Sequence, residues 1–494
     1  MRSGGILMHI TSLPSPAGVG AMGADARAFV DFLADAGQRF WQILPVCPTG
    51  YGDSPYQSFS TFAGNPYLID LDDLAADGLL SPGDYRNIDW QSPPDRVNYS
   101  VLYQKRYPVL RRAAAALLAD PPAEYAGFCR SQAGWLPDYA LFMALKDENG
   151  GRPWTLWEPA LHRRDPAALA AARARLAGDV AFWQAVQYLF FRQWRALKQY
   201  ANGRGVSIIG DLPIYVALDS VDVWADPSQF QLDGQLEPVE VAGCPPDGFS
   251  ATGQLWGNPL FDWAAMERDG FAWWIRRIRH VCGIYDVVRI DHFRGFAGYY
   301  AIPFGSADAR GGRWRPGPGM KLFSAVERAL GRQNIIAEDL GFLSEDVHQL
   351  LQDAGFPGMK VLEFAFDSRD GGEYRPHTYP THCVAYTGTH DNEPLNGWFS
   401  TAPADGVARA AAYLNLTDGE GWNWGMMRGV WASAADLAVV QAQDVLGLGH
   451  EARMNTPSTL GGNWSWRALP GAFTPALAAR LRGCMELYGR LDPS

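Results

Sequence analysis

Short apolar runs that end in polar residues recur along the chain, and each run predicts a strand. The eight runs are Ile6–Ile10, Phe40–Leu44, Val206–Ile209, Val287–Ile290, Ile335–Ala337, Val361–Phe364, Val384–Tyr386 and Ala452–Met454. Stretches with a helical apolar stripe lie between most of them, chiefly Gly23–Gly37, Phe182–Tyr200, Trp274–Cys282 and Ser344–Ala354. Strands that alternate with helices and end in polar residues predict an α/β fold, an eight-stranded parallel (β/α)8 TIM barrel.

The uneven spacing of the runs predicts insertions into a single catalytic barrel domain, residues 1–494. The second and third runs are separated by far more residues than a βα loop needs. The helical stretches in this gap are Tyr103–Leu118, Ala123–Gln132, Leu136–Asp147 and Pro166–Leu176. They predict a mostly helical subdomain at residues 85–180. A segment rich in Pro, Gly and aromatics after the third run, residues 219–263, predicts a lid or side wall, and residues 397–442 are predicted to be helical.

The composition is that of a large globular protein with an excess of acidic residues. Its 494 residues are 47% hydrophobic, enough for a sizeable core, and its formal net charge of −11 argues against a broad nucleic-acid surface. No apolar run is long enough to span a membrane, and the N-terminal residues lack a signal-peptide core. Six widely spaced cysteines indicate free thiols in a reducing compartment, so we expect a cytoplasmic protein.

Aromatic residues make up 13% of the chain, and many lie in polar loops rich in Gly and Pro. Two such loops are residues 51–57 and 254–259. Exposed aromatic faces beside Asp, Asn and His suit sugar rings, whose C–H faces stack on them while their hydroxyls take hydrogen bonds. This pattern favours a carbohydrate ligand.

The stretch Asp286–Gly295 places several charges at the end of a predicted strand. Arg289 and Asp291 are two residues apart, so in a strand they point to the same face. The guanidinium would lower the pKa of the carboxyl group and hold it ionised. Because barrel enzymes carry their catalytic groups at the C-terminal ends of the strands, we interpret this pair as catalytic. The alternative is a structural Arg–Asp salt bridge.

Carboxylates stand at the ends of three predicted strands: Asp291, Glu338 and Asp391. Retaining cleavage of a glycoside needs two carboxyl groups about 5–5.5 Å apart, a nucleophile and a general acid/base. Asp291 fits the nucleophile. Glu338 fits the acid because the apolar run before it, Ile335–Ala337, would raise the pKa of its carboxyl group. Asp391 could bind sugar hydroxyls and favour the distorted transition state. Each acid taken alone could equally form a salt bridge or a helix cap.

His292 and His390 beside these acids raise a competing interpretation, a metal site. The local spacings typical of His and carboxylate ligands are absent, so we expect no metal. Gly-x-Ser-x-Gly and Walker sequences are absent as well, which excludes serine-hydrolase and P-loop nucleotide chemistry.

The charged stretches and several loops together resemble the amylomaltases, the 4-α-glucanotransferases or disproportionating enzymes of the α-amylase clan. The matching stretches are Gly5–Ser15, Tyr51–Ser60, Gly210–Ala217, Gln254–Pro259, Val288–Gly295, Ile336–Gly341, Thr387–Asn392, Asn455–Pro457 and Gly462–Trp464. They follow one another along the whole chain, and the helical region at residues 85–180 matches least.

The resemblance implies a transferase that acts by a retaining double displacement. Asp291 would attack the anomeric carbon of a donor α-1,4-glucan while Glu338 protonates the leaving chain. The 4-hydroxyl of a second glucan, deprotonated by Glu338, would then take the glucosyl unit, and Asp391 would stabilise the transition state. The partners implied are donor and acceptor maltodextrins, with no cofactor and no evident protein partner.

The resemblance also implies the side chains that bind the glucan. The candidates are Tyr56, Asp211, Trp256, Asn258, Arg289, His292, Phe364, His390 and Asn463. Asp211, Arg289 and His390 would surround the scissile bond. The aromatic loop residues could instead pack within their loops, and Phe364, on the sixth predicted strand, either borders the site or belongs to the core.

Two other functions stay open. An α-glucan hydrolase would use the same covalent intermediate, so transfer does not follow from the three acids alone. A lid at residues 219–263 that excludes water would favour transfer. A glucan-binding protein without catalysis is the other alternative, and the intact set of acids argues against it.

Overall fold

The computed structural model describes residues 2–50, 52–246, 250–341, 343–367 and 372–491. One sheet contains eight parallel strands in the order β10-β11-β12-β1-β2-β3-β6-β9. Their bounds are Ser3–Leu7 (β1), Phe40–Gln42 (β2), Ser207–Leu212 (β3), Val287–Ile290 (β6), Ile335–Ala337 (β9), Gly358–Val361 (β10), Cys383–Tyr386 (β11) and Leu437–Gln441 (β12). β1 is therefore paired with both β12 and β2.

The two ends of this sheet, β9 and β10, approach each other and bring it close to a closed barrel. The amide of Ala337 donates a hydrogen bond to the carbonyl of Pro357 over 3.0 Å. The amide of Met359 donates to the Asp339 carboxylate over 2.6 Å, so a side chain takes the place of one backbone acceptor. The (β/α)8 barrel predicted from the alternating pattern is confirmed.

Two of the predicted strands were wrong in position. The eighth strand is β12, inside the segment 397–442 that was predicted to be helical, and Ala452–Met454 lies at the end of a 3-10 turn. All five residues of β12 are buried, as in a barrel strand covered on both faces, whereas Arg453 is committed to ion pairing. The sixth strand ends at Val361, and residues Leu362–Phe366 form the 3-10 turn η8, so Phe364 is not on a strand.

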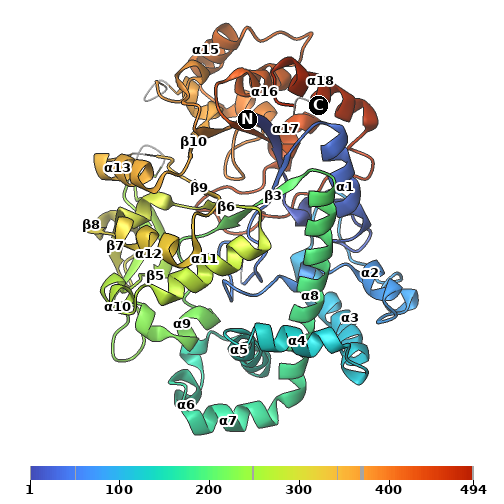
Figure 1. Cartoon of the computed structure of the whole chain (residues 1–494), viewed down its shortest axis with the longest axis vertical. Coiled ribbons are helices and arrows are strands. Elements are labelled where there is room, and N and C mark those ends of the chain that lie inside the picture. Colours follow the sequence, from blue (N-terminus) through green and yellow to red (C-terminus); the bar gives the residue numbers. More distant parts are fainter. Residues whose placement is uncertain (1, 51, 247–249, 342, 368–371, 492–494) are drawn as a thin grey trace.

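The predicted helices are present to within a few residues, except that the helices predicted at Tyr103–Leu118 and Phe182–Tyr200 begin several residues earlier. Helices along the outside of the barrel and its C-terminal part (Figure 1) are α1 (Ala24–Asp35), α2 (Leu71–Ala76), α8 (Ala177–Gly203), α10 (Trp263–Arg268), α11 (Ala272–Ile284), α12 (Met320–Leu330), α13 (Glu345–Ala354), α14 (Leu395–Thr401), α15 (Ala404–Leu414), α16 (Trp422–Ala432), α17 (Ala442–Leu446) and α18 (Pro475–Leu487). α13 ends at Gly355, whose φ of 66° is the left-handed conformation that favours glycine.

A group of helices between β2 and β3 lies below the barrel in Figure 1. Its members are α3 (Tyr99–Ala119), α4 (Ala123–Ser131), α5 (Leu136–Glu148), α6 (Pro159–His162) and α7 (Pro166–Arg175). The buried ammonium of Lys146 on α5 donates a 2.6 Å hydrogen bond to Asp219, in the segment between β3 and α9. This ion pair ties the helical group to the segment that follows β3.

That segment, residues 219–263, contributes to a second sheet. After α9 (Val221–Ala225), it supplies β4 (Glu240–Cys244) and β5 (Gln254–Pro259). β4 pairs antiparallel with both β5 and β7 (Gly298–Pro303), and β7 pairs with β8 (Arg313–Pro316), which gives the order β5-β4-β7-β8. Residues 247–249, within the lid predicted here, lie outside the described residues, as does Tyr51 in the first aromatic loop.

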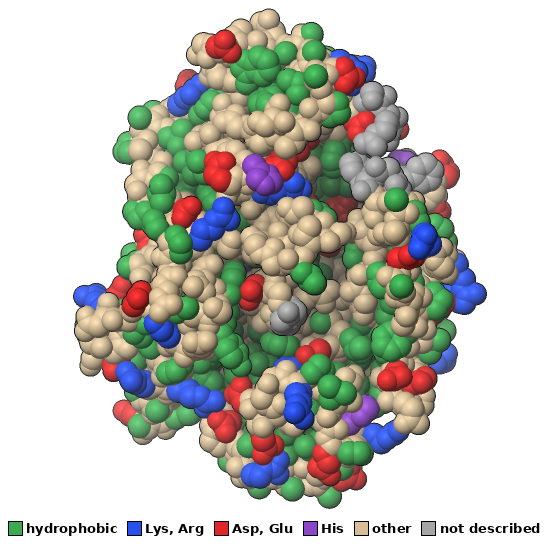
Figure 2. Space-filling model, turned by 180° about the vertical axis from the view of Figure 1, so that it is seen from behind, with side chains coloured by type: hydrophobic (Ala, Val, Ile, Leu, Met, Phe, Trp, Pro, Cys, Tyr) green, Lys and Arg blue, Asp and Glu red, His purple; other side chains and the backbone are tan. Residues whose placement is uncertain are grey.

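On the face shown in Figure 2, the basic and acidic side chains of the described residues are interspersed. None of the helices in the described ranges is both long and apolar enough to cross a membrane. All six cysteines are free thiols, as the sequence predicted.

Candidate active site

The floor of the site is a buried cation between two carboxylates at the ends of β3 and β6. Nη1 of Arg289 lies 2.7 and 2.8 Å from the two oxygens of Asp211 and 3.0 Å from Oδ1 of Asp291. Asp211 and Arg289 face each other in the register between the two strands, and their side chains are 0% and 4% exposed. The predicted Arg289–Asp291 pair is therefore present, and Asp211 belongs to the same ion-paired group.

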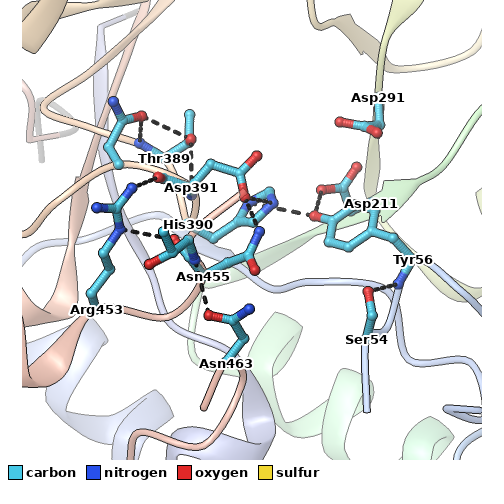
Figure 3. A network of polar contacts seen from close by, with 12 residues as sticks. Ser54, Tyr56, Asp211, Asp291, Thr389, His390, Asp391, Arg453, Asn455 and Asn463 are labelled. Carbon is cyan, nitrogen blue, oxygen red and sulfur yellow. Dashed lines mark hydrogen bonds and ion pairs between the residues drawn. The ribbon is translucent and has the colours of Figure 1, made fainter. Parts of the chain in front are cut away.

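Tyr56 connects this floor to the opposite wall of the site (Figure 3). Its hydroxyl donates a 2.7 Å hydrogen bond to Oδ2 of Asp211. The Tyr56 hydroxyl oxygen also lies 3.4 Å from Nδ1 of His390, and the rings of Tyr56 and His390 are stacked with centroids 5.0 Å apart. Burial, followed by the charge of Asp211, raises the pKa of Tyr56 well above its usual value, so the phenol stays a donor.

Asp391 follows β11 and projects into the site from the opposite wall. The side-chain nitrogen Nδ2 of Asn455 donates a 2.6 Å hydrogen bond to Oδ1 of Asp391, and Nε2 of His390 lies 3.4 Å from the same oxygen (Figure 3). Its side chain is 45% exposed, compared with 29% for Asp291. Asp391 thus faces a more open part of the site than the carboxylates at the floor.

Glu338 follows β9, and its carboxylate is fixed by two backbone amides. His292 N donates to Oε2 over 2.7 Å, and Leu340 N donates to Oε1 over 2.8 Å. His292 has a φ of 52°, a left-handed conformation that is strained for a residue with a side chain and that aims its amide at this carboxylate. Glu338 is thereby attached to the turn that directly follows Asp291.

The two carboxyl groups expected to react both have raised pKa values. Burial raises the pKa of Asp291 to about 6, although Arg289 pulls it down. Burial also raises the pKa of Glu338 to about 7, opposed by Arg289 and reinforced by the negative charge of Asp291. The increase at Glu338 agrees with the expectation from its apolar flank. The expected decrease at Asp291 is wrong, because burial and the neighbouring Asp211 outweigh the cation.

Arg289 itself remains a cation. Burial lowers the pKa of a guanidinium, but the charges of Asp211 and Asp291 outweigh this effect and raise the pKa of Arg289 well above its usual value. The site therefore holds one fixed positive charge beside Asp291. This charge lies next to the carboxylate whose negative charge changes when it forms or loses a covalent bond.

The aromatic loops lie beside these acids. Trp256 on β5 meets the ring of His292 edge to face at 4.9 Å. Burial lowers the pKa of His292 to about 3, so its ring is neutral, and its buried Nε2 has no hydrogen-bond partner among the described residues. Asn258 is buried, with its oxygen accepting from Gln57 over 3.1 Å and its nitrogen donating to the carbonyl of Val216 over 2.8 Å. These bonds fix Asn258 between the two loops.

Two candidates lie further from this network. Phe364 is half-buried on η8 and packs edge to face on Tyr374 at 5.4 Å. Asn463 accepts a 3.0 Å hydrogen bond from the amide of Thr456, so it shapes the loop that carries Asn455. The other candidates are linked by side-chain contacts around the ends of β3, β6, β9 and β11.

Sequence reasoning missed two residues that hold Asp391. Asn455 was part of a matching stretch but received no role, although it contacts the carboxylate directly. Arg453 donates 2.6 Å hydrogen bonds to the carbonyl of Asp391 and to the carboxylate of Glu393. It stood inside a wrongly predicted strand, so nothing in the local pattern indicated this contact.

The arrangement provides a carboxylate beside a cation, a second carboxyl group that keeps its proton close to neutral pH, and stacked aromatic rings around them. Such a set is suited to glycosyl transfer through a covalent intermediate. Among the residues that the structure describes, no three His, Cys, Asp or Glu side chains are grouped as metal ligands.

Comparisons with known proteins agree with this chemistry. A sequence family described as 4-alpha-glucanotransferase matches residues 8–471. The chain is 49% identical to the 4-alpha-glucanotransferase of Thermus thermophilus over 99% of both chains, and 46% identical to that of Clostridium butyricum over 98% of this chain and 100% of the relative. Its fold matches the amylomaltase from Streptococcus agalactiae in complex with acarbose over 100% of both chains, with a TM-score of 0.97 and 42% identity. This chain therefore belongs to the 4-alpha-glucanotransferase family.

Proposed function

We propose that the protein transfers a segment of an α-1,4-glucan from a donor maltodextrin to the 4-hydroxyl of an acceptor glucan or glucose, with retention of configuration. The observation that carries this proposal is the pairing of Asp291, which contacts Arg289 at 3.0 Å, with Glu338, whose pKa is raised to about 7. One group is suited to attack and the other to protonate.

In the first step an oxygen of Asp291 bonds to the anomeric carbon of the donor. The bond from that carbon to the glycosidic oxygen breaks, and the proton of Glu338 moves to that oxygen, so the leaving chain departs with a new 4-hydroxyl. In the second step the 4-hydroxyl of the acceptor bonds to the same carbon, and the bond to Asp291 breaks. The hydroxyl proton returns to Glu338, which restores both carboxyl groups to their starting states.

The remaining side chains bind the sugar in this proposal. Asp391 stabilises the oxocarbenium-like transition state through its negative charge, and Asp211, Arg289 and His390 surround the scissile bond. The neutral His292, with its unpaired Nε2, accepts or donates one hydrogen bond to a sugar hydroxyl. The other residues of this set are Tyr56, Trp256, Asn258, Phe364 and Asn463.

Transfer requires that a sugar, and not water, reaches the covalent intermediate. We assign this role to the segment 219–263, which brings Trp256 next to His292. The helical region 85–180 supports this segment through the Lys146–Asp219 ion pair. Replacing Trp256 with Ala should increase the ratio of hydrolysis to transfer, measured as reducing ends released per chain transferred. An unchanged ratio would contradict the assignment of segment 219–263 as the part that excludes water.

The experiment that tests the function is incubation of the pure protein with maltotriose followed by separation of the products. We expect glucose plus a ladder of longer maltodextrins, with little net gain of reducing ends. Net gain of reducing ends without longer chains would establish a hydrolase instead. If neither maltotriose nor longer maltodextrins react although they bind, the protein is a glucan-binding protein.

The proposal needs no cofactor, because the two carboxyl groups and the acceptor hydroxyl balance all proton transfers. We also propose the cytoplasm as its location, and the six free thiols fit such a reducing compartment. Fractionation of cells with an antibody against the protein tests the location.

A further inference from the structure

The carboxylate of Asp391 is held differently from those of Asp211 and Asp291, which contact a guanidinium. Its side chain contacts the side-chain amide of Asn455 at 2.6 Å and the ring of His390 at 3.4 Å. A half-exposed carboxylate with such partners has a choice of rotamers, and a long arginine side chain does not fix it directly. Its orientation therefore comes from the backbone, from Asn455 and, at a longer distance, from His390.

Arg453 fixes the backbone on both sides of this contact. Its Nη2 donates to the carbonyl of Asp391 over 2.6 Å, and its Nε donates to the carbonyl of Asn455 over 2.9 Å. One planar guanidinium thus sets the distance between the residue that carries the carboxylate and the residue that holds it (Figure 3). The backbone amide of Asn455 also donates to the carbonyl of His390 over 3.2 Å, which links the same two segments a second time.

The positive charge of Arg453 is paired away from Asp391. Nη1 lies 2.6 Å from Oε1 of Glu393, and the two side chains are only 19% and 11% exposed. Because Glu393 takes up the charge, Arg453 can orient Asp391 through its carbonyl while leaving the negative charge of the carboxylate available to the site.

The other side of Asp391 is fixed through its own loop. The carboxamide oxygen of Asn392 accepts from both the amide and the hydroxyl of Thr389 at 2.9 Å, and its nitrogen donates to the buried carboxyl of Glu363 at 3.2 Å. The amide of Asp391 donates to the Thr389 hydroxyl at 3.3 Å. The loop is therefore fixed on one side by the contacts of Thr389 and Asn392. Its attachment to the segment of Asn455 comes from Arg453 and from the backbone bond to His390.

We propose that Arg453 and Asn455 are positioning residues for the proposed glucan transfer, acting together to hold the Asp391 carboxylate against the reacting sugar. This inference rests on the proposed function, because it assigns a purpose to the placement of Asp391. A carboxylate displaced by about 1 Å loses most of its effect on the transition state and little of its effect on ground-state binding. The two residues should therefore matter for kcat and hardly for KM.

The test compares Arg453→Met with Arg428→Met in the full-length protein. Arg428 is a matched control, because it also pairs with a glutamate, Glu420, at 2.8 Å and donates to a backbone carbonyl, that of Leu414, at 2.8 Å. With maltotriose, we expect Arg453→Met to lower kcat by about 10- to 100-fold with KM within about threefold of the wild type. Arg428→Met should change kcat by less than about twofold. Equal kcat for the two variants would overturn the proposal.

Asn455→Ala is the second variant, which removes the contact to the carboxylate and leaves the backbone bonds of residue 455 in place. It should lower kcat in the same way, and Arg453→Lys should recover part of the loss, since a lysine supplies one of the three bonds. If Arg453→Met does not fold, a wild-type kcat in Asn455→Ala overturns the proposal. Failure of the wild type to make longer chains from maltotriose would instead reject the proposed function.

Discussion

The two walls of the active site hold their carboxylates by different means. At β3 and β6, one buried guanidinium contacts Asp211 and Asp291 within 3.0 Å, so charge is balanced by charge. At β11, the carboxylate of Asp391 is bound by an amide, and the cation of Arg453 is turned toward the backbone and Glu393. The cation beside Asp291 favours the ionised form of that carboxyl group against the effect of burial, whereas the partners of Asp391 fix the direction of its carboxylate.

The largest effect should come from removing the nucleophile. Asp291→Asn keeps the shape of the side chain but cannot form the covalent bond, so we expect kcat to fall by about 10⁴-fold or more. Asp391→Asn should cost less, about 10²- to 10³-fold, because it removes a stabilising charge and leaves the covalent step possible. Rates with maltotriose measure both. Maltotriose binding, followed by calorimetry, should persist in both variants, and a larger loss in Asp391→Asn would reverse the comparison.

The cation at the floor comes next. Arg289→Lys retains the positive charge, but the shorter lysine side chain does not bring its ammonium to the position of Nη1, the one nitrogen that contacts both Asp211 and Asp291. We expect kcat to drop by about 100-fold and the free energy of unfolding to drop by about 1–3 kcal/mol, because buried acceptors lose their donors. Urea denaturation and the maltotriose assay give the two values. Arg428→Lys, at a more exposed ion pair, serves as the control. Equal losses in both variants would show that the buried contacts of Arg289 contribute no more to kcat or stability than a surface ion pair.

The dependence of kcat/KM on pH should be a narrow bell. Asp291 must be ionised to attack, so activity is lost as pH falls below its pKa of about 6. Glu338 must be protonated to release the leaving chain, so activity is lost as pH rises above its pKa of about 7. Each limb falls about tenfold per pH unit. Because the charge of Asp391 contributes to the raised pKa of Asp291, Asp391→Asn should move the acidic limb to lower pH and leave the alkaline limb in place.

The smallest effect should come from the residue that joins the two walls. Tyr56→Phe removes the 2.7 Å hydrogen bond to Asp211 and keeps the stacking on His390. A hydrogen bond to a charged group contributes about 1.5–3 kcal/mol, so we expect kcat/KM to fall by about 10- to 100-fold, at the lower end where Arg289 compensates. Tyr56→Ala, which also removes the stacked ring, should fall further. If both variants have the same kcat/KM, the ring does not support His390.

The wall at β3 and β6 was largely readable from the sequence, and the wall at β11 was not. Arg289 and Asp291 are two residues apart in a strand, so their shared face follows from local geometry. Asn455 and Asp391 are 64 positions apart and meet only because two loops converge. Arg453 was hidden for the same reason, and its run, Ala452–Met454, was too short to separate a strand from a turn by its apolar pattern.

The barrel itself followed from the alternation of apolar runs and helical stripes, which is a repeated local signal. β12 was not recognised because its five residues follow α16 after a short loop and continue directly into α17, so the period of the apolar pattern changes within few residues. The pKa of Asp291 could not be predicted in direction, since the net result depends on how deeply the whole fold buries the strand end.

Because β1 is hydrogen-bonded to β12, with Leu7 opposite Gln441, the barrel cannot close until the ribosome has made almost the entire chain. At roughly 5–20 residues per second, the β12-facing edge of β1 waits for tens of seconds without its partner. An unpaired apolar edge is prone to aggregation during this time. The carboxylates on β6, β9 and β11 also cannot take up their final positions before closure, so a nascent or truncated chain should be inactive toward glucans in the cell.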